Sequence, residues 1–354
     1  MSGWRLLADL VGYHLIPCLL ASCLIWVLVS LVFRSLRRPG ERVPFLYLSL
    51  LKALSALCVG AGLSCLAPAQ LYGIICLRLP NLVPAGSPLE PNRLTLAFAH
   101  SGLTGFVVGA SLVVALVLLL RRWARLAPIY RDVYRAGAAR GHEFPELYQA
   151  FQELVDRALP GKWPPRPRLL IVPQAPAPAF TMGIRRPAIV LSRELAERLG
   201  PAELQGIVGH ELGHVSRLDY LGRWLAVILR DVMIWNPFVV AWYDQLEREQ
   251  EQTADEFAAG LLADPSALAA GLVELVAHLQ EAFPASLGPR AVERRRRARK
   301  ALDERLHALE EIQQRAPVPR ARVVLAAVLL GFLLAQPQVA LSFPSILRFL
   351  HHLG

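Results

Sequence analysis

The sequence predicts a mostly α-helical integral membrane protein that carries one cytoplasmic domain of mixed α and β structure. Hydrophobic residues make up 54% of the 354 residues, more than a soluble chain of this length usually contains. The excess is concentrated in uncharged stretches near the two ends of the chain. The part between them is about 200 residues long, enough to form a single hydrophobic core.

Four apolar stretches are expected to cross the membrane, because each is close to the ~20 residues that a spanning helix needs. They are residues 12–33, 45–67, 102–120 and 323–342. For the second, a shifted window at 53–77 also fits, since it places Lys52 at the membrane edge.

Basic residues at the ends of these stretches predict the orientation. Arginines cluster after the first, after the third and before the fourth, whereas the connection at 68–101 contains only two. Positive residues stay on the cytoplasmic side. We therefore expect a membrane domain over 1–120 with an outer loop at 68–101, a cytoplasmic domain over 121–322, the fourth span at 323–342, and a short extracytoplasmic tail at 343–354.

The net charge of +10 comes in large part from one run, Arg294–Lys300. A basic segment beside a cytoplasmic membrane surface is typical of contact with anionic lipid headgroups. A solvated charged helix explains the run equally well, and direct nucleic-acid binding is the least favoured explanation. All five cysteines precede residue 77, so none is available to the cytoplasmic domain. Cys65 and Cys76 could pair on the outer side, but buried single thiols are favoured.

Within the cytoplasmic domain the pattern predicts a small sheet followed by helices. A strand is expected at 168–173 and a hairpin at 179–184 and 188–191, because short apolar runs are separated there by turn residues. A helix interrupted near Gly141 precedes them over 127–159. The helices that follow begin near Ser192 and at Pro201, the latter running through His214, and then cover 219–235, 237–263, 265–281 and 289–315.

The sequence His210-Glu211-Leu-Gly-His214 is the most informative feature of this domain. Residues four apart lie on one face of a helix, so both imidazoles can bind one zinc ion. Glu211 would then lie beside the open coordination position, where a carboxylate can accept a proton from a water molecule. This arrangement predicts a zinc-dependent hydrolase. Gly213 is expected either to permit a close approach of a helix or substrate or to be merely tolerated.

A third protein ligand is expected from the acidic segment at 247–255. Glu251 and Asp255 are four residues apart, which suits a ligand followed by a carboxylate that orients a ligand imidazole. Glu247 shares their face and is the rival ligand, whereas Glu249 points elsewhere. Because both motifs must meet at one ion, the apolar segment 218–243 is predicted to turn back without crossing the membrane.

These motifs resemble the BlaR/MecR-type antirepressor membrane metallopeptidases. The resemblance covers about residues 1–342 and includes the span order and the text at 183–191, 204–219, 235–237 and 251–255. It implies that His210, His214 and Glu251 are zinc ligands, Glu211 is the catalytic base and Asp255 orients a ligand. It also implies a location in the bacterial inner membrane with the active site on the cytoplasmic side.

The strand Ala179-Phe180-Thr181-Met182-Gly183 resembles the substrate-side strand of the related HtpX and CAAX-protease group. That resemblance implies a peptide substrate extended along the sheet edge. Unlike the sensor proteins of the antirepressor family, the chain has only residues 343–354 after the last span, with no penicillin-binding domain. A trigger would therefore act through the outer loop, the spans or a partner. A homodimer or a separate sensor protein is the expected partner.

The sequence thus predicts an integral-membrane zinc endopeptidase that cuts a cytoplasmic or membrane-proximal protein, for which a transcriptional repressor is one candidate. The alternatives are an HtpX-like protease for membrane protein quality control and a zinc-containing signalling scaffold that does not cleave. Glu211 disfavours the scaffold, because binding zinc does not require the base.

Overall fold

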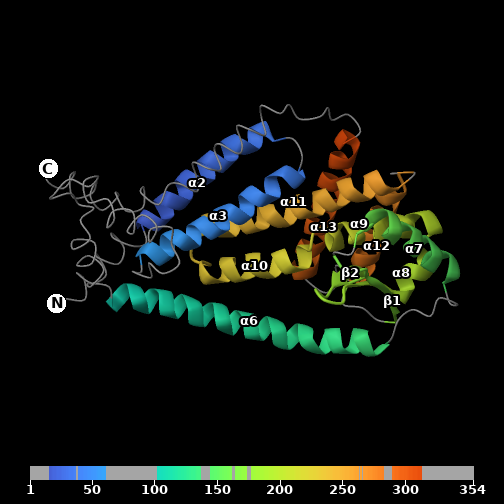
Figure 1. Cartoon of the computed structure of the whole chain (residues 1–354), viewed down its shortest axis with the longest axis horizontal. Helices are drawn as coiled ribbons and strands as arrows, with labels where there is room; N and C mark the ends of the chain where they lie inside the picture. The colour runs from blue at the N-terminus through green and yellow to red at the C-terminus, as the bar shows by residue number, and fades with distance from the viewer. Residues whose placement is uncertain are drawn as a thin grey trace.

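The computed structural model describes residues 16–36, 39–60, 102–136, 144–161, 164–173, 177–262, 264, 266–282 and 289–312. This part of the chain is mostly helical with one small sheet, as predicted (Figure 1). The predicted fourth span, outer loop and tail, together with Cys65 and Cys76, lie outside the described residues.

Three helices correspond to the first three predicted spans: α2 (Ile16–Ser35), α3 (Pro39–Gly60) and α6 (Gly102–Ala136). Among the described residues, no helix meets the length and hydropathy that a membrane crossing requires. The predicted membrane topology is therefore not confirmed. Helix α6 does not end at residue 120, the predicted end of the third span, but continues through the basic segment to Ala136.

The sheet has three strands, β1 (Arg168–Val172), β2 (Ala179–Met182) and β3 (Ala188–Ser192), in the order β1-β3-β2. β2 and β3 form the predicted antiparallel hairpin, and β1 pairs with β3 in parallel. All five residues of the central strand β3 are buried, which explains why its first four residues are all apolar. Within the described sheet β2 is an edge strand, and it lies beside the helix that carries His210.

The remaining helices follow the predicted order with small shifts at their ends. They are α7 (Pro145–Ala158), α8 (Arg193–Arg198), α9 (Pro201–Ser216), α10 (Asp219–Val232), α11 (Pro237–Leu261), α12 (Ser266–Ala282) and α13 (Pro289–Ile312). The chain turns between α10 and α11 at 233–236, so the prediction that 218–243 turns back is confirmed.

Two hydrophobic cores meet along α11, the long helix that lies beside α3 in Figure 1. The first half of α11 packs with α2, α3 and α10, where Trp242 and Leu246 are almost fully buried. Its second half packs with α7, α9, α12 and the sheet, where Ala258 is fully buried. The 210–214 motif on α9 and the 247–255 segment on α11 lie where the two cores join.

Glycines on α9 allow neighbouring helices to come unusually close. A Cβ atom at Gly213 would lie 3.1 Å from Ala254 Cα on α11, and one at Gly206 would lie 2.8 Å from Leu268 Cα on α12. Gly213 therefore permits a close helix approach, the first of the two roles considered for it. These contacts fix α9 at the centre of the domain, with its two histidines facing α11.

We expect Gly206→Ala to lower the free energy of unfolding by about 1–3 kcal/mol, because the added methyl group would meet rigid helix backbone. Gly260→Ala is the matched control, since nothing lies within 4 Å of a Cβ atom there. That change should leave stability unchanged or raise it by up to about 1 kcal/mol. Thermal unfolding of the full chain, followed by circular dichroism, measures both; equal effects of the two changes would contradict the packing described.

Candidate metal centre

α9 places His210, Glu211 and His214 in the interior, where they are 5%, 7% and 9% exposed. The two imidazoles are one helical turn apart, and their Nε2 atoms are separated by 3.2 Å. Their rings are perpendicular, with centroids 4.8 Å apart. Both Nε2 atoms therefore face one common point, as the helical spacing predicted.

α11 brings Glu251 to the same point. Its Oε2 atom lies 3.4 Å from His210 Nε2, and its Oε1 atom lies 3.6 Å from His214 Nε2. One ligand atom from each of the three residues lies within 4.8 Å of the others. Among the described residues, this is the one cluster of histidine, cysteine and acidic side chains with such geometry.

The rival glutamates on α11 have other partners. Glu247 Oε1 accepts a hydrogen bond of 2.7 Å from the Tyr243 hydroxyl. Glu249, as predicted, points elsewhere and pairs with Arg42 of α3 at 3.2 Å. The structure thus brings Glu251, and not Glu247, to the histidine pair.

Each histidine is oriented by a buried carboxylate behind it. His210 Nδ1 lies 2.8 Å from Asp255 Oδ1, and His214 Nδ1 lies 2.8 Å from Asp219 Oδ2. A carboxylate at Nδ1 fixes the proton there and leaves Nε2 free to bind a metal ion. Asp255 was expected in this position from the sequence.

Asp219 does for His214 what Asp255 does for His210, but the sequence did not predict this role for it. The chain leaves α9 through Leu218, whose φ of 55° is left-handed and turns Asp219 back toward His214. Left-handed backbone is uncommon at a leucine. No regular spacing rule predicts such a turn, so this contact could not be predicted from residue spacing.

Neighbouring charges shift the pKa values of two candidate ligands, His210 and Glu251. Burial and the charge of Arg305 lower the pKa of His210, but Asp255 and Glu251 outweigh them and raise it to about 9. Burial raises the pKa of Glu251, but His210, His214 and Arg305 together hold it well below its usual range. Two imidazole nitrogens and a carboxylate are a donor set that zinc binds in hydrolases, so the residues fit this ion.

Glu211 points toward the edge strand β2. Thr181 Oγ1 donates a hydrogen bond of 2.6 Å to Glu211 Oε2, so the strand holds the carboxylate in place. Of the other predicted strand residues, Ala179 and Phe180 pack against hydrophobic cores, Met182 is buried, and Gly183 ends the strand with a φ of 85°. Their predicted contact with substrate stays a prediction.

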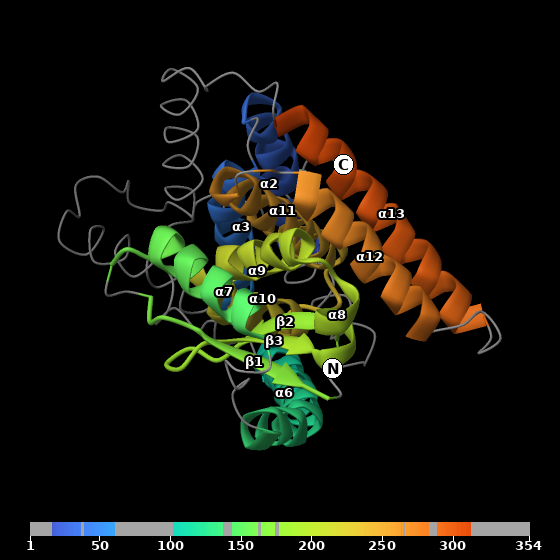
Figure 2. The same ribbon diagram turned by 90° about the vertical axis from the view of Figure 1, so that its right-hand side faces the viewer.

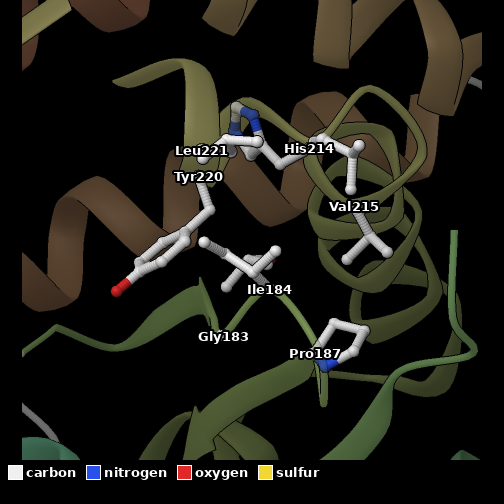
Figure 3. Close-up of a pocket in the computed structure, with 9 residues that line it drawn as sticks. Gly183, Ile184, Pro187, His214, Val215, Tyr220 and Leu221 are labelled. Carbon is white, nitrogen blue, oxygen red and sulfur yellow. The ribbon is translucent and has the colours of Figure 1, made fainter. Parts of the chain in front are cut away.

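A small, mainly apolar pocket lies against His214 (Figure 3). It extends from the end of β2 to the first turn of α10. Its lining consists of Thr181, Gly183, Ile184, Pro187, His214, Val215, Leu218, Tyr220 and Leu221. The pocket places apolar surface directly beside the candidate metal ligands.

Two arginines that no sequence motif places at the site flank Glu251. Arg223 of α10 donates to Glu251 Oε1 at 3.1 Å, and Arg305 Nη1 of α13 lies 3.6 Å from Glu251 Oε2. In the chain, Arg223 precedes Glu251 by 28 residues and Arg305 follows it by 54 residues. Helical periodicity places residues on a face but does not say which helices meet, so these contacts could not be predicted.

We expect Glu251→Ala to lower the zinc content of the purified protein strongly and Glu247→Ala to leave it unchanged. The first removes a carboxylate between the two imidazoles, and the second removes one held by Tyr243. Metal analysis after dialysis against a weak chelator measures both. Zinc loss in the Glu247 variant with retention in the Glu251 variant would contradict the geometry.

Comparison with known proteins shows which protein families the chain resembles. The family described as BlaR1 peptidase M56 matches residues 103–264. The protease HtpX homologue of Acaryochloris marina is 30% identical over 215 residues, covering 51% of this chain and 71% of that protein. The homologue of Nostoc punctiforme is 29% identical over 214 residues, covering 59% of this chain and 72% of the relative.

A more distant HtpX homologue, from Thermococcus kodakarensis, is 27% identical over 160 residues, covering 44% of this chain and 54% of that protein. No solved structure matches the chain. The named relatives are thus HtpX proteases, and the predicted assignment to the BlaR/MecR antirepressors is not confirmed beyond the peptidase domain.

Proposed function

The chain belongs to the protease family of the HtpX homologues, and on this premise we propose that it is a zinc-dependent endopeptidase of the HtpX type. The observation that carries the proposal is the position of Glu251, with one carboxylate oxygen near each histidine Nε2 atom. A family of proteases and a three-donor site with a neighbouring glutamate together support peptide hydrolysis.

His210, His214 and Glu251 would hold the zinc ion. When bound, zinc would lower the pKa of a water molecule and stabilise negative charge on the carbonyl oxygen of the scissile bond. Glu211 would accept the proton of the attacking water and pass it to the leaving amine. Thr181 holds the Glu211 carboxylate with a hydrogen bond, while Asp255 and Asp219 would hold both imidazoles in the tautomer that leaves Nε2 free.

The substrate is proposed to lie extended along the open edge of β2, because an edge strand offers free backbone groups to a peptide. The Thr181–Glu211 contact supports this placement, since it brings that strand to the catalytic carboxylate. We propose membrane proteins, including damaged ones, as the substrates, and the bacterial inner membrane as the location.

Cleavage of a transcriptional repressor is the less supported role, because the relatives reported are HtpX proteases. The non-cleaving scaffold is also disfavoured, because Glu211 is buried and held by a dedicated hydrogen bond. Contact of Arg294–Lys300 with anionic lipid, and a homodimer or separate sensor partner, stay predictions.

We expect Glu211→Gln to lower peptidase activity by about 10²-fold or more, while zinc stays bound. The amide keeps the shape of the side chain but cannot accept the proton. Glu153→Gln, an exposed change on α7, is the control and should have no effect. Cleavage of casein by the full chain in detergent, with zinc content measured alongside, tests this; full activity of the Glu211 variant would contradict the proposed base.

The same variant is suited to substrate trapping, because it should bind a substrate without cutting it. We expect cross-linking in cells to recover a diverse set of membrane proteins. Recovery of one dominant repressor-like protein would contradict the quality-control role and favour the regulatory one.

A further inference from the structure

α13 is a highly charged helix that lies along α12 on the outside of the domain (Figure 2). One face nevertheless packs inward, with Leu302 and Leu309 against the hydrophobic core. Arg305 lies on that face between the two leucines. Its side chain is 18% exposed, whereas that of Arg297 on the same helix is 79% exposed.

The guanidinium of Arg305 donates two hydrogen bonds to the Asp255 carboxylate. Nε donates to Oδ2 at 2.7 Å, and Nη2 donates to Oδ1 at 2.6 Å. Nη2 also lies 3.2 Å from His210 Nδ1, and Nη1 lies 3.6 Å from Glu251 Oε2. One side chain of α13 therefore contacts two of the three candidate metal ligands and the carboxylate that orients one of them.

This geometry defines the orientation of Asp255 more tightly than His210 alone could. A planar guanidinium that binds both oxygens of a carboxylate fixes the plane of that carboxylate. Asp255 is 1% exposed, so water cannot readily replace these two bonds. With Oδ1 fixed, His210 Nδ1 has a fixed acceptor, and the imidazole cannot rotate away from the metal position.

Leu302 and Leu309 attach α13 to the core by hydrophobic contact, and this packing alone does not explain an arginine between them. A long aliphatic side chain at 305 would fill the same space between Leu302 and Leu309, but it would leave the buried carboxylate of Asp255 without its cation. The peptidase region matched by the family ends at residue 264, so this contact comes from beyond it.

We propose that Arg305 is a positioning residue of the metal centre, which holds Asp255 and through it His210 in the geometry that binds zinc. The inference rests on the proposed function only in that both require a metal ion at His210, His214 and Glu251. It makes α13 part of the active site, although the helix provides no ligand.

The test compares the zinc affinity of three variants of the full chain in detergent, by competition with a chromophoric chelator. Arg305→Met should weaken zinc binding by about 10–100-fold, the usual effect of removing a group that supports a metal ligand. Arg305→Lys should give a smaller loss of zinc affinity, because it keeps the positive charge but not the bidentate contact with Asp255. Arg299→Met, an exposed change on the same helix, is the charge-matched control and should bind zinc as the wild type does.

A double-mutant cycle with Asp255→Asn separates positioning from a general loss of stability. If Arg305 acts through Asp255, Arg305→Met should weaken zinc binding much less in the Asp255→Asn background than in the wild type. Zinc affinity of Arg305→Met within twofold of the wild type would overturn the proposal, as would equal losses in both backgrounds. These affinities do not depend on cleavage, so an active Glu211→Gln variant would contradict the proposed protease mechanism without deciding the role of Arg305.

Discussion

The close packing of α9 on α11 is the constraint on which the candidate metal centre depends. A glutamate side chain reaches only a few ångströms, so Glu251 can lie between His210 and His214 only if the two helices nearly touch. Gly213 faces Ala254, and Gly209 faces Ala258, so small side chains line the contact on both helices. The spacing that brings the ligands together is therefore encoded in residues that take no part in the chemistry.

Burying the site requires charges that compensate one another. Glu211, Asp219, Asp255 and both histidines are buried, and isolated charges there would be costly. Arg305 pairs with Asp255, Arg217 pairs with Asp219, and Thr181 donates to Glu211. The network draws on β2, α9, the start of α10, α11 and α13. Such a network tolerates partial loss poorly, because removing one partner leaves another buried group unsatisfied.

The sequence predicted the local elements well and the contacts between them only where periodicity sufficed. The helices α9 to α12 and the β2–β3 hairpin begin and end within a few residues of their predicted limits. The pairs His210–His214 and Glu251–Asp255 followed from four-residue spacing. Glu251 was predicted as the ligand with Glu247 as its rival, because both share one helical face, and the contacts of Glu251 with α9 distinguish them.

Contacts that do not follow from helical spacing were missed. Asp219 reaches His214 through an unusual backbone turn at Leu218, and Arg305 reaches Asp255 from a helix whose basic run suggested a lipid-facing role. The hydrogen bond from Thr181 to Glu211 was not predicted, and the proposed contact of the 179–183 strand with substrate stays a prediction. The four membrane spans rested on hydropathy, and the described helices do not confirm them.

X-ray absorption spectroscopy at the zinc edge, on the full chain loaded with one equivalent of zinc, tests the central claim most directly. A site of His210, His214 and Glu251 predicts only nitrogen and oxygen ligands at about 2.0–2.2 Å, with two imidazoles. Glu251→Ala should change this spectrum and Glu247→Ala should not. A sulfur shell at about 2.3 Å would contradict the account, because every cysteine of the chain precedes residue 77.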